Sequence, residues 1–137
     1  MAEADVAVAA LDRDSGERFQ SLRGALGVSS FGMNLIVLQP RQRGRVHAHE
    51  HQEEVYLVLE GELTLIVEGA ERMLGPDELA RVGPSARRQL VNAGSRRVVL
   101  LALGVAPVCV MLLIGFGAPP PTVAELLYAV HTSDGRS

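Results

Sequence analysis

The chain has 137 residues, 47% of them hydrophobic, and a formal net charge of −3 at pH 7 with both signs scattered along it. Such a length is typical of one domain with its own core, and the charge pattern lacks the basic stripe that nucleic acid requires, so we expect no nucleic-acid partner. Because Cys109 is the single cysteine and residues 1–20 lack the pattern of a secretory signal, we expect no internal disulfide and a cytoplasmic location.

The predicted elements begin after an N-terminal extension, residues 1–25, which is alanine-rich at its start and shows no sign of chemistry. The first predicted strand lies within residues 31–39, where apolar side chains recur at alternate positions until Pro40 ends the pattern. Residues 54–68 are expected to form two strands that turn as a hairpin at Gly61. Further strands are expected once within residues 70–85 and twice within residues 86–104.

The pattern as a whole predicts an all-β fold. Short strands separated by Gly, Pro and Asn turns, without a long helical period between them, favour an antiparallel sandwich, jelly roll or small barrel. One helix is predicted near the end of the chain, at residues 121–132. There Val123, Leu126, Leu127 and Val130 recur with the spacing of one helix face.

Residues 98–118 carry no charge and are long enough to cross a bilayer. Gly104, Pro107 and Gly115 interrupt the stretch and divide it into apolar runs of strand length, which favours buried strands instead. We expect residues 108–116 to be covered by a second subunit as a strand in a homodimer interface, because alone they would expose a large apolar patch. A membrane anchor remains the alternative interpretation.

Residues 47–54, HAHEHQEE, concentrate histidine and glutamate just before a predicted strand. In an extended segment alternate residues share a face, so His47 and His49 point the same way. Glu54 begins the next strand, and its carboxylate reaches the same point if that strand pairs beside the first. Two imidazoles and one carboxylate suit a divalent transition metal, with Fe, Mn, Ni, Cu and Zn all compatible. The alternative is a solvated polar turn.

Two neighbours in the same stretch are possible additional ligands. His51 continues the alternation but falls where the chain should turn, and Glu53 has the opposite parity to Glu54. We therefore rank both below the three residues that converge.

These residues resemble the first motif of the cupin superfamily, which runs HxH, three or four residues, Glu, six residues and Gly. The matching positions are His47, His49, Glu54 and Gly61. The glycine that usually opens the motif, six residues before the first histidine, is Arg41 here. The resemblance extends over residues 31–104 and implies a jelly-roll barrel, usually dimeric, with a metal site inside. On this interpretation the barrel spans residues 26–108, and residues 109–137 form an apolar strand and a short helix.

The second cupin motif is degenerate. Aligning Asn92 with the asparagine of the motif places Arg88 at the histidine that is normally the fourth metal ligand. Asp77 and Ser85 stand where the motif has glycines, and Gly83 stands where it has a proline.

Arg88 changes the electrostatics of the implied site, because a guanidinium stays protonated and has no lone pair for a metal. Facing inward, it repels a divalent cation by about 4 kcal/mol per facing charge at 4 Å and an effective dielectric constant of 20. Three outcomes differ in function: Arg88 binds an anionic substrate beside the metal, it pairs with Glu54 in place of the metal, or it turns outward with Arg87. We expect Arg88, Tyr56 and Asn92 to contact a ligand.

Two functions follow. The first is a small cupin that binds a divalent metal through two His and one Glu and acts on a small organic substrate. The second is a metal-free cupin that binds a small anion through Arg88 and serves as a non-catalytic sensor or binding module. The residues alone do not decide whether the protein is an enzyme, because cupins share one fold across many chemistries.

Overall fold

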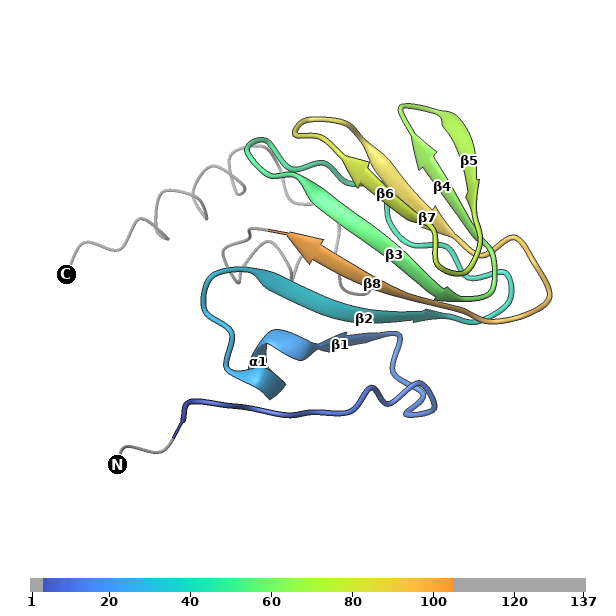
Figure 1. Ribbon diagram of the computed structural model, residues 1–137. Helices are drawn as coiled ribbons and strands as arrows, with labels where there is room; N and C mark the ends of the chain where they lie inside the picture. The colour runs from blue at the N-terminus through green and yellow to red at the C-terminus, as the bar shows by residue number, and fades with distance from the viewer. Residues whose placement is uncertain (1–3, 105–137) are drawn as a thin grey trace.

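The computed structural model describes residues 4–104, which form two antiparallel β-sheets that face each other across one core (Figure 1). The strands are β1 (Phe19–Ser21), β2 (Gly32–Leu38), β3 (Glu54–Glu60), β4 (Leu63–Val67), β5 (Ala70–Leu74), β6 (Leu79–Val82), β7 (Arg88–Val91) and β8 (Val98–Gly104). The larger sheet has the order β1-β2-β8-β3-β6 and the smaller one β5-β4-β7. The predicted all-β jelly-roll fold is confirmed.

The core lies between the sheets and is built from alternate residues of their strands. On β3 the side chains of Tyr56 and Val58 point into it, and their neighbours Val55 and Leu57 point to the other face. Both sheets contribute to one apolar cluster: Ile36, Leu38, Tyr56, Val58, Leu63, Leu65, Leu74, Val82, Leu90, Val98, Leu100 and Ala102.

A short helix, α1 (Leu22–Leu26), lies against the outer face of the large sheet and is the only helix among the described residues. It begins at Ser21, whose hydroxyl accepts from the Gly24 backbone N–H, and it ends at Gly27, whose φ of 70° is left-handed. Its Leu22 packs with residues of β2 and β8 in a second apolar cluster. The other buried members of this second cluster are Leu35, Val37 and Val99. Strands at the centre of the large sheet are thus buried on both faces.

The predicted hairpin at Gly61 is wrong, because β3 and β4 belong to different sheets. Gly61 has a φ of 78°, and a Cβ placed on it would overlap the backbone carbonyl of Arg97. A register shift between Val58 and Glu60 lies just before this turn. The bulge and the left-handed glycine direct the chain from one sheet into the other rather than back along β3.

Residues 70–85 contain two strands, β5 and β6, where the sequence indicated one. β5 pairs with β4 through a turn in which Glu68 and Gly69 both have positive φ, 48° and 81°, as in a type I′ hairpin. Four of the five β5 residues are exposed, so this strand lacks the apolar alternation by which a strand is recognised.

Two predictions fall on residues 105–137, outside the described residues: the helix at 121–132 and the interface strand at 108–116. Within residues 4–104, no helix is long and apolar enough to cross a membrane. The domain boundaries at 25/26 and 108/109 stay a prediction, although β1 already pairs with β2 before the first of them.

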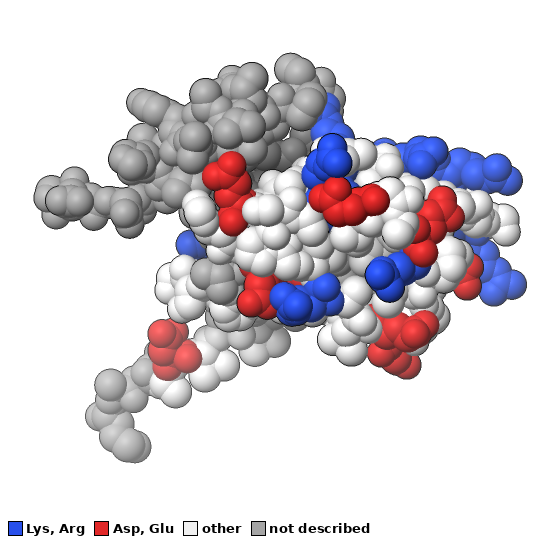
Figure 2. Space-filling model, turned by 90° about the horizontal axis from the view of Figure 1, so that it is seen from above, with Lys and Arg blue, Asp and Glu red and all other residues white. Residues whose placement is uncertain are grey.

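Charged side chains of both signs are interspersed on the described surface that Figure 2 shows. Neither sign forms a continuous field there, in keeping with the scattered charges of the sequence.

Candidate metal centre

The two histidines of the HxH motif lie on an extended segment that pairs with β7 of the small sheet. The backbone groups of His47 and Arg88 exchange both hydrogen bonds, at 2.9 and 2.8 Å, and Gly44 N–H donates to the Leu90 carbonyl at 2.7 Å. Directly opposed residues of an antiparallel pair project to the same face. The register therefore places Arg88 beside His47 on the inner face.

Glu54 comes from the other sheet. It is the first residue of β3 and stands opposite Gly104 of β8 and Val82 of β6. The strand pairing on which the convergence of Glu54 with the histidines was made conditional does not occur, and the carboxylate instead reaches His47 and His49 across the inside of the barrel. One potential ligand atom from each of these three residues, the ligand triad, lies within 4.8 Å of the other two.

His47 presents a free lone pair to this point. Its Nδ1 is 3.1 Å from the Arg45 carbonyl, and because a carbonyl only accepts, Nδ1 carries the proton of the neutral ring and Nε2 the lone pair. Burial lowers the pKa of His47, which favours this neutral form. A backbone carbonyl on the far nitrogen is the arrangement that orients histidine ligands in metal sites.

Glu54 and His49 are both almost completely buried, and Glu54 Oε2 lies 2.8 Å from His49 Nε2, although the two are not aligned as a hydrogen bond. Burial by itself raises the pKa of Glu54, but the interactions with His49 and Tyr56 outweigh it and lower the pKa below its usual value. The carboxylate is thus held in its anionic form, as a metal ligand must be.

Arg88 is fully buried and firmly held. Its Nη2 donates to the carbonyls of Gly83 and Ala86, each at 2.9 Å, and its Nε donates to Ala86 at 3.1 Å. Its Nη1 lies 3.8 Å from Glu54 Oε2 and has no hydrogen-bond partner. The outward orientation with Arg87 is therefore wrong, because Arg88 points into the barrel while Arg87 pairs with Glu68 on the surface.

Tyr56 follows Glu54 by two residues on β3 and points to the same side. Its hydroxyl is near Glu54 and Arg88 but forms no hydrogen bond of normal geometry with either. Burial raises the pKa of Tyr56 well above its usual value, so the phenol stays a neutral donor. We call Tyr56 and Arg88 the donor pair.

The remaining predicted site residues lie apart from the ligand triad. The side chain of His51 is 72% exposed, and exposed Glu53 pairs with Arg81 on the surface. Asn92 is buried at the opposite end of β7 from Arg88. Its amide donates to the carbonyls of Leu38 and Arg96, and its oxygen accepts from Gly94, so the side chain fixes a turn.

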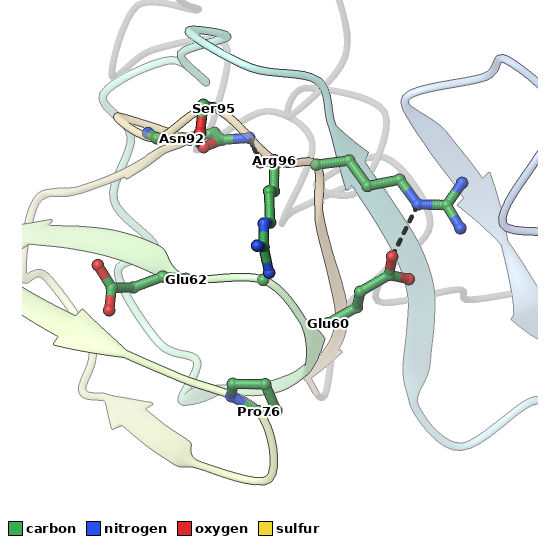
Figure 3. Close-up of a pocket in the computed structure, with 9 residues that line it drawn as sticks. Glu60, Glu62, Pro76, Asn92, Ser95 and Arg96 are labelled. Atoms are coloured by element: carbon green, nitrogen blue, oxygen red, sulfur yellow. Dashed lines mark hydrogen bonds and ion pairs between the residues drawn. The ribbon is translucent and has the colours of Figure 1, made fainter.

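That turn borders a recess of about 510 Å³ at the end of β3 that is remote from the ligand triad. Figure 3 shows Arg96 extending between Glu60 and Glu62 in this recess. Glu60 is engaged by Arg97, whose Nε lies 3.0 Å from its carboxylate. The sequence contained no signal for this recess, because its lining comes from turns that only the fold brings together.

Two facing sheets with histidine and carboxylate ligands converging between them define a jelly-roll protein with an internal polar centre. A model of the family described as "Cupin domain" matches residues 34–104, more than half of the chain. The chain belongs to the cupin superfamily.

Solved structures agree with this assignment. A cupin protein from Bacteroides fragilis has a TM-score of 0.66 and 20% identity, with 85% of this chain and 93% of that chain covered, and shows the fold alone. A cupin-superfamily sugar phosphate isomerase from Silicibacter pomeroyi has a TM-score of 0.59 and 27% identity, with 66% and 60% covered. This chain therefore spans about three fifths of the length of that isomerase. Comparison with curated proteins gives no match.

Proposed function

We propose that the protein binds one divalent transition metal ion through His47, His49 and Glu54 and acts on a small organic substrate inside the barrel. The observation that carries the proposal is the convergence of three potential ligand atoms within 4.8 Å, contributed by both sheets. When bound, such an ion acts as a Lewis acid that polarises a substrate oxygen.

The hydrogen-bonding state of the centre supports this proposal. Within residues 4–104, six buried side-chain nitrogen and oxygen atoms lack a hydrogen-bond partner, and five of them belong to the ligand triad and the donor pair. Buried polar atoms are normally satisfied, so their concentration at one point favours a ligand there. An ion fits the triad because neutral imidazole rings and a carboxylate can each supply a lone pair, at His47 Nε2, at His49 Nε2 with the proton on Nδ1, and at Glu54 Oε1.

A second candidate is a metal-free module that binds a small anion without catalysis. It is favoured by one observation, the 3.8 Å approach of Arg88 Nη1 to Glu54 Oε2, which balances the buried carboxylate without an ion. In this case Arg88 takes the position of the fourth ligand, and its guanidinium supplies the positive charge that the metal ion would otherwise supply.

Elemental analysis of the tag-free protein distinguishes the two candidates. Metal at a 1:1 ratio in the parent, lost in His47→Ala, supports the first. A metal-free parent that acquires metal only in Arg88→His, which adds a third imidazole at the position of the fourth ligand, supports the second. The exposed His51→Ala variant is the matched control and should retain the metal content of the parent.

The reaction is open to a direct first test. The 27% sequence identity to a cupin-superfamily sugar phosphate isomerase supports isomerisation of a sugar phosphate as the first activity to assay. We also propose a cytoplasmic homodimer, supported by the uncharged residues 98–118, which continue beyond β8. A detergent-free monomer in gel filtration at micromolar concentration would contradict the dimer.

A further inference from the structure

Five side-chain atoms of the centre lack a hydrogen-bond partner, and they divide into two chemical kinds. His47 Nε2 and Glu54 Oε1 offer lone pairs, as His49 Nε2 does when its ring carries the proton on Nδ1, whereas the Tyr56 hydroxyl and Arg88 Nη1 offer protons. A cation satisfies the first kind and leaves the second without a hydrogen-bond acceptor, since Arg88 Nη1 is 3.8 Å from Glu54 Oε2. The donor pair therefore requires a separate acceptor, and a negatively charged oxygen is the strongest one.

The charge of the centre leads to the same requirement. Glu54 and Arg88 cancel each other, so a divalent ion adds two positive charges that no described side chain at the centre balances. Uncompensated charge is costly to bury. An anion that enters with the ion removes most of that cost.

The donor pair is held in place before any ligand arrives. The guanidinium of Arg88 is anchored to Gly83 and Ala86 by three hydrogen bonds, and the ring of Tyr56 is fully buried in the core. Donors that are fixed in advance bind without a further ordering cost.

We propose that Arg88 Nη1 and the Tyr56 hydroxyl bind a small oxyanion, a carboxylate or a phosphate, and that this anion and the metal ion bind as a mutually dependent pair. The inference rests on the proposed metal site. By linkage, the anion raises the affinity for the ion by the same factor by which the ion raises the affinity for the anion. The substrate class that follows is a small molecule with an anionic oxygen next to its reacting atoms.

The test titrates the full-length protein with Co²⁺ and follows its visible spectrum and its affinity by calorimetry. Each titration is run with formate, with inorganic phosphate, and with chloride at matched ionic strength. Formate or phosphate should tighten Co²⁺ binding by about 5- to 150-fold, the usual range of such coupling, and shift the spectrum, whereas chloride should not. Whichever anion is effective identifies the carboxylate or the phosphate as the source.

Variants separate anion binding from structural support. Arg88→Gln should abolish the anion effect while Co²⁺ alone binds as tightly as in the parent or more tightly, because one positive charge is gone. Tyr56→Phe removes only the hydroxyl and should weaken the anion effect without loss of folding. Arg87→Gln, an exposed neighbour paired with Glu68, is the matched control and should behave as the parent.

The outcomes for the two proposals are distinct. Stoichiometric Co²⁺ binding that neither formate nor phosphate affects overturns the oxyanion site and leaves the metal site standing. An anion effect that survives in both Arg88→Gln and Tyr56→Phe also overturns it. Absence of Co²⁺ binding in the parent under every condition overturns the metal site and this inference together.

Discussion

Arg88 is the residue that most affects the stability of the centre. Its guanidinium is fully buried, satisfies two backbone carbonyls and is the cation nearest to the Glu54 carboxylate. Removing one partner of a buried ion pair typically costs about 3–5 kcal/mol, because the other charge is left uncompensated. We expect Arg88→Met to lower the free energy of unfolding by this amount in metal-free protein, measured by urea denaturation.

The same variant should recover part of the loss when Mn²⁺ is added, since the ion then takes over the charge of Glu54. Arg87→Met, at the exposed residue just before β7, should leave stability unchanged. A loss for Arg88→Met as small as that for Arg87→Met would contradict the buried pair.

Three further residues show what the degenerate motifs retain. Arg41, Asp77 and Ser85 occupy the positions where the cupin motifs have glycine, and all three have left-handed φ values, 70°, 69° and 66°. The glycines have been replaced but the backbone conformation that favours glycine persists. The sequence therefore showed correctly that the glycines of the motifs are replaced. It could not show that the turns keep their left-handed backbone conformation.

Restoring glycine at these positions should stabilise the protein. A left-handed conformation costs an ordinary residue about 1–2 kcal/mol, and the added flexibility of glycine in the unfolded chain offsets part of the gain. We expect about 0.5–1 kcal/mol for Arg41→Gly and less for Asp77→Gly, since aspartate tolerates this region better. Urea denaturation measures both, and a loss of stability in Arg41→Gly would show that its side chain has an overriding role.

At the scale of the elements, the turn at Gly61 holds the two sheets in their relative position. It combines a left-handed φ with a backbone approach to Arg97 that leaves no room for a Cβ. We expect Gly61→Ala to cost at least about 2 kcal/mol, more than conformational strain alone. Gly69→Ala provides the control, because Gly69 has a similar φ of 81° but open space around it, so only strain of about 1 kcal/mol remains. Equal losses in the two variants would contradict the steric argument.

Alternation along the chain predicted which residues face inward but not which strands are neighbours. Parity placed His47 and His49 on one face, Tyr56 and Arg88 were expected to contact a ligand, and the structure buries both inside the barrel. Parity is a local property, however, whereas pairing depends on turns such as Gly61 and on a register set by distant backbone hydrogen bonds. The partnership of His47 with β7, and of Glu54 with β8 and β6, was for that reason beyond the reach of the sequence.

At the scale of the whole molecule, the proposed metal site joins the two sheets. The HxH segment is hydrogen-bonded to β7 of the small sheet, and Glu54 begins β3 of the large sheet. An ion held by all three ligands therefore adds a cross-link between layers that already contact each other through the apolar core, the connecting turns and the Arg88–Glu54 ion pair. Binding to the folded state alone stabilises it by about 2.7 kcal/mol when free metal is at one hundred times its dissociation constant.

This cross-link predicts where metal binding slows hydrogen exchange. Saturation of the parent with Co²⁺ should increase the protection of backbone amides in both β7 and the first half of β3, although these strands lie in different sheets. In Glu54→Gln the two histidines retain contact with the ion but the large sheet loses its ligand, so added protection should be confined to residues 43–49 and β7. Exchange measured by mass spectrometry, with metal-free parent as the reference, resolves the two patterns. If β3 of the parent gains no more protection at saturating metal than β3 of Glu54→Gln, Glu54 is not a ligand, because a bond from the ion to Glu54 should stabilise the start of β3 directly.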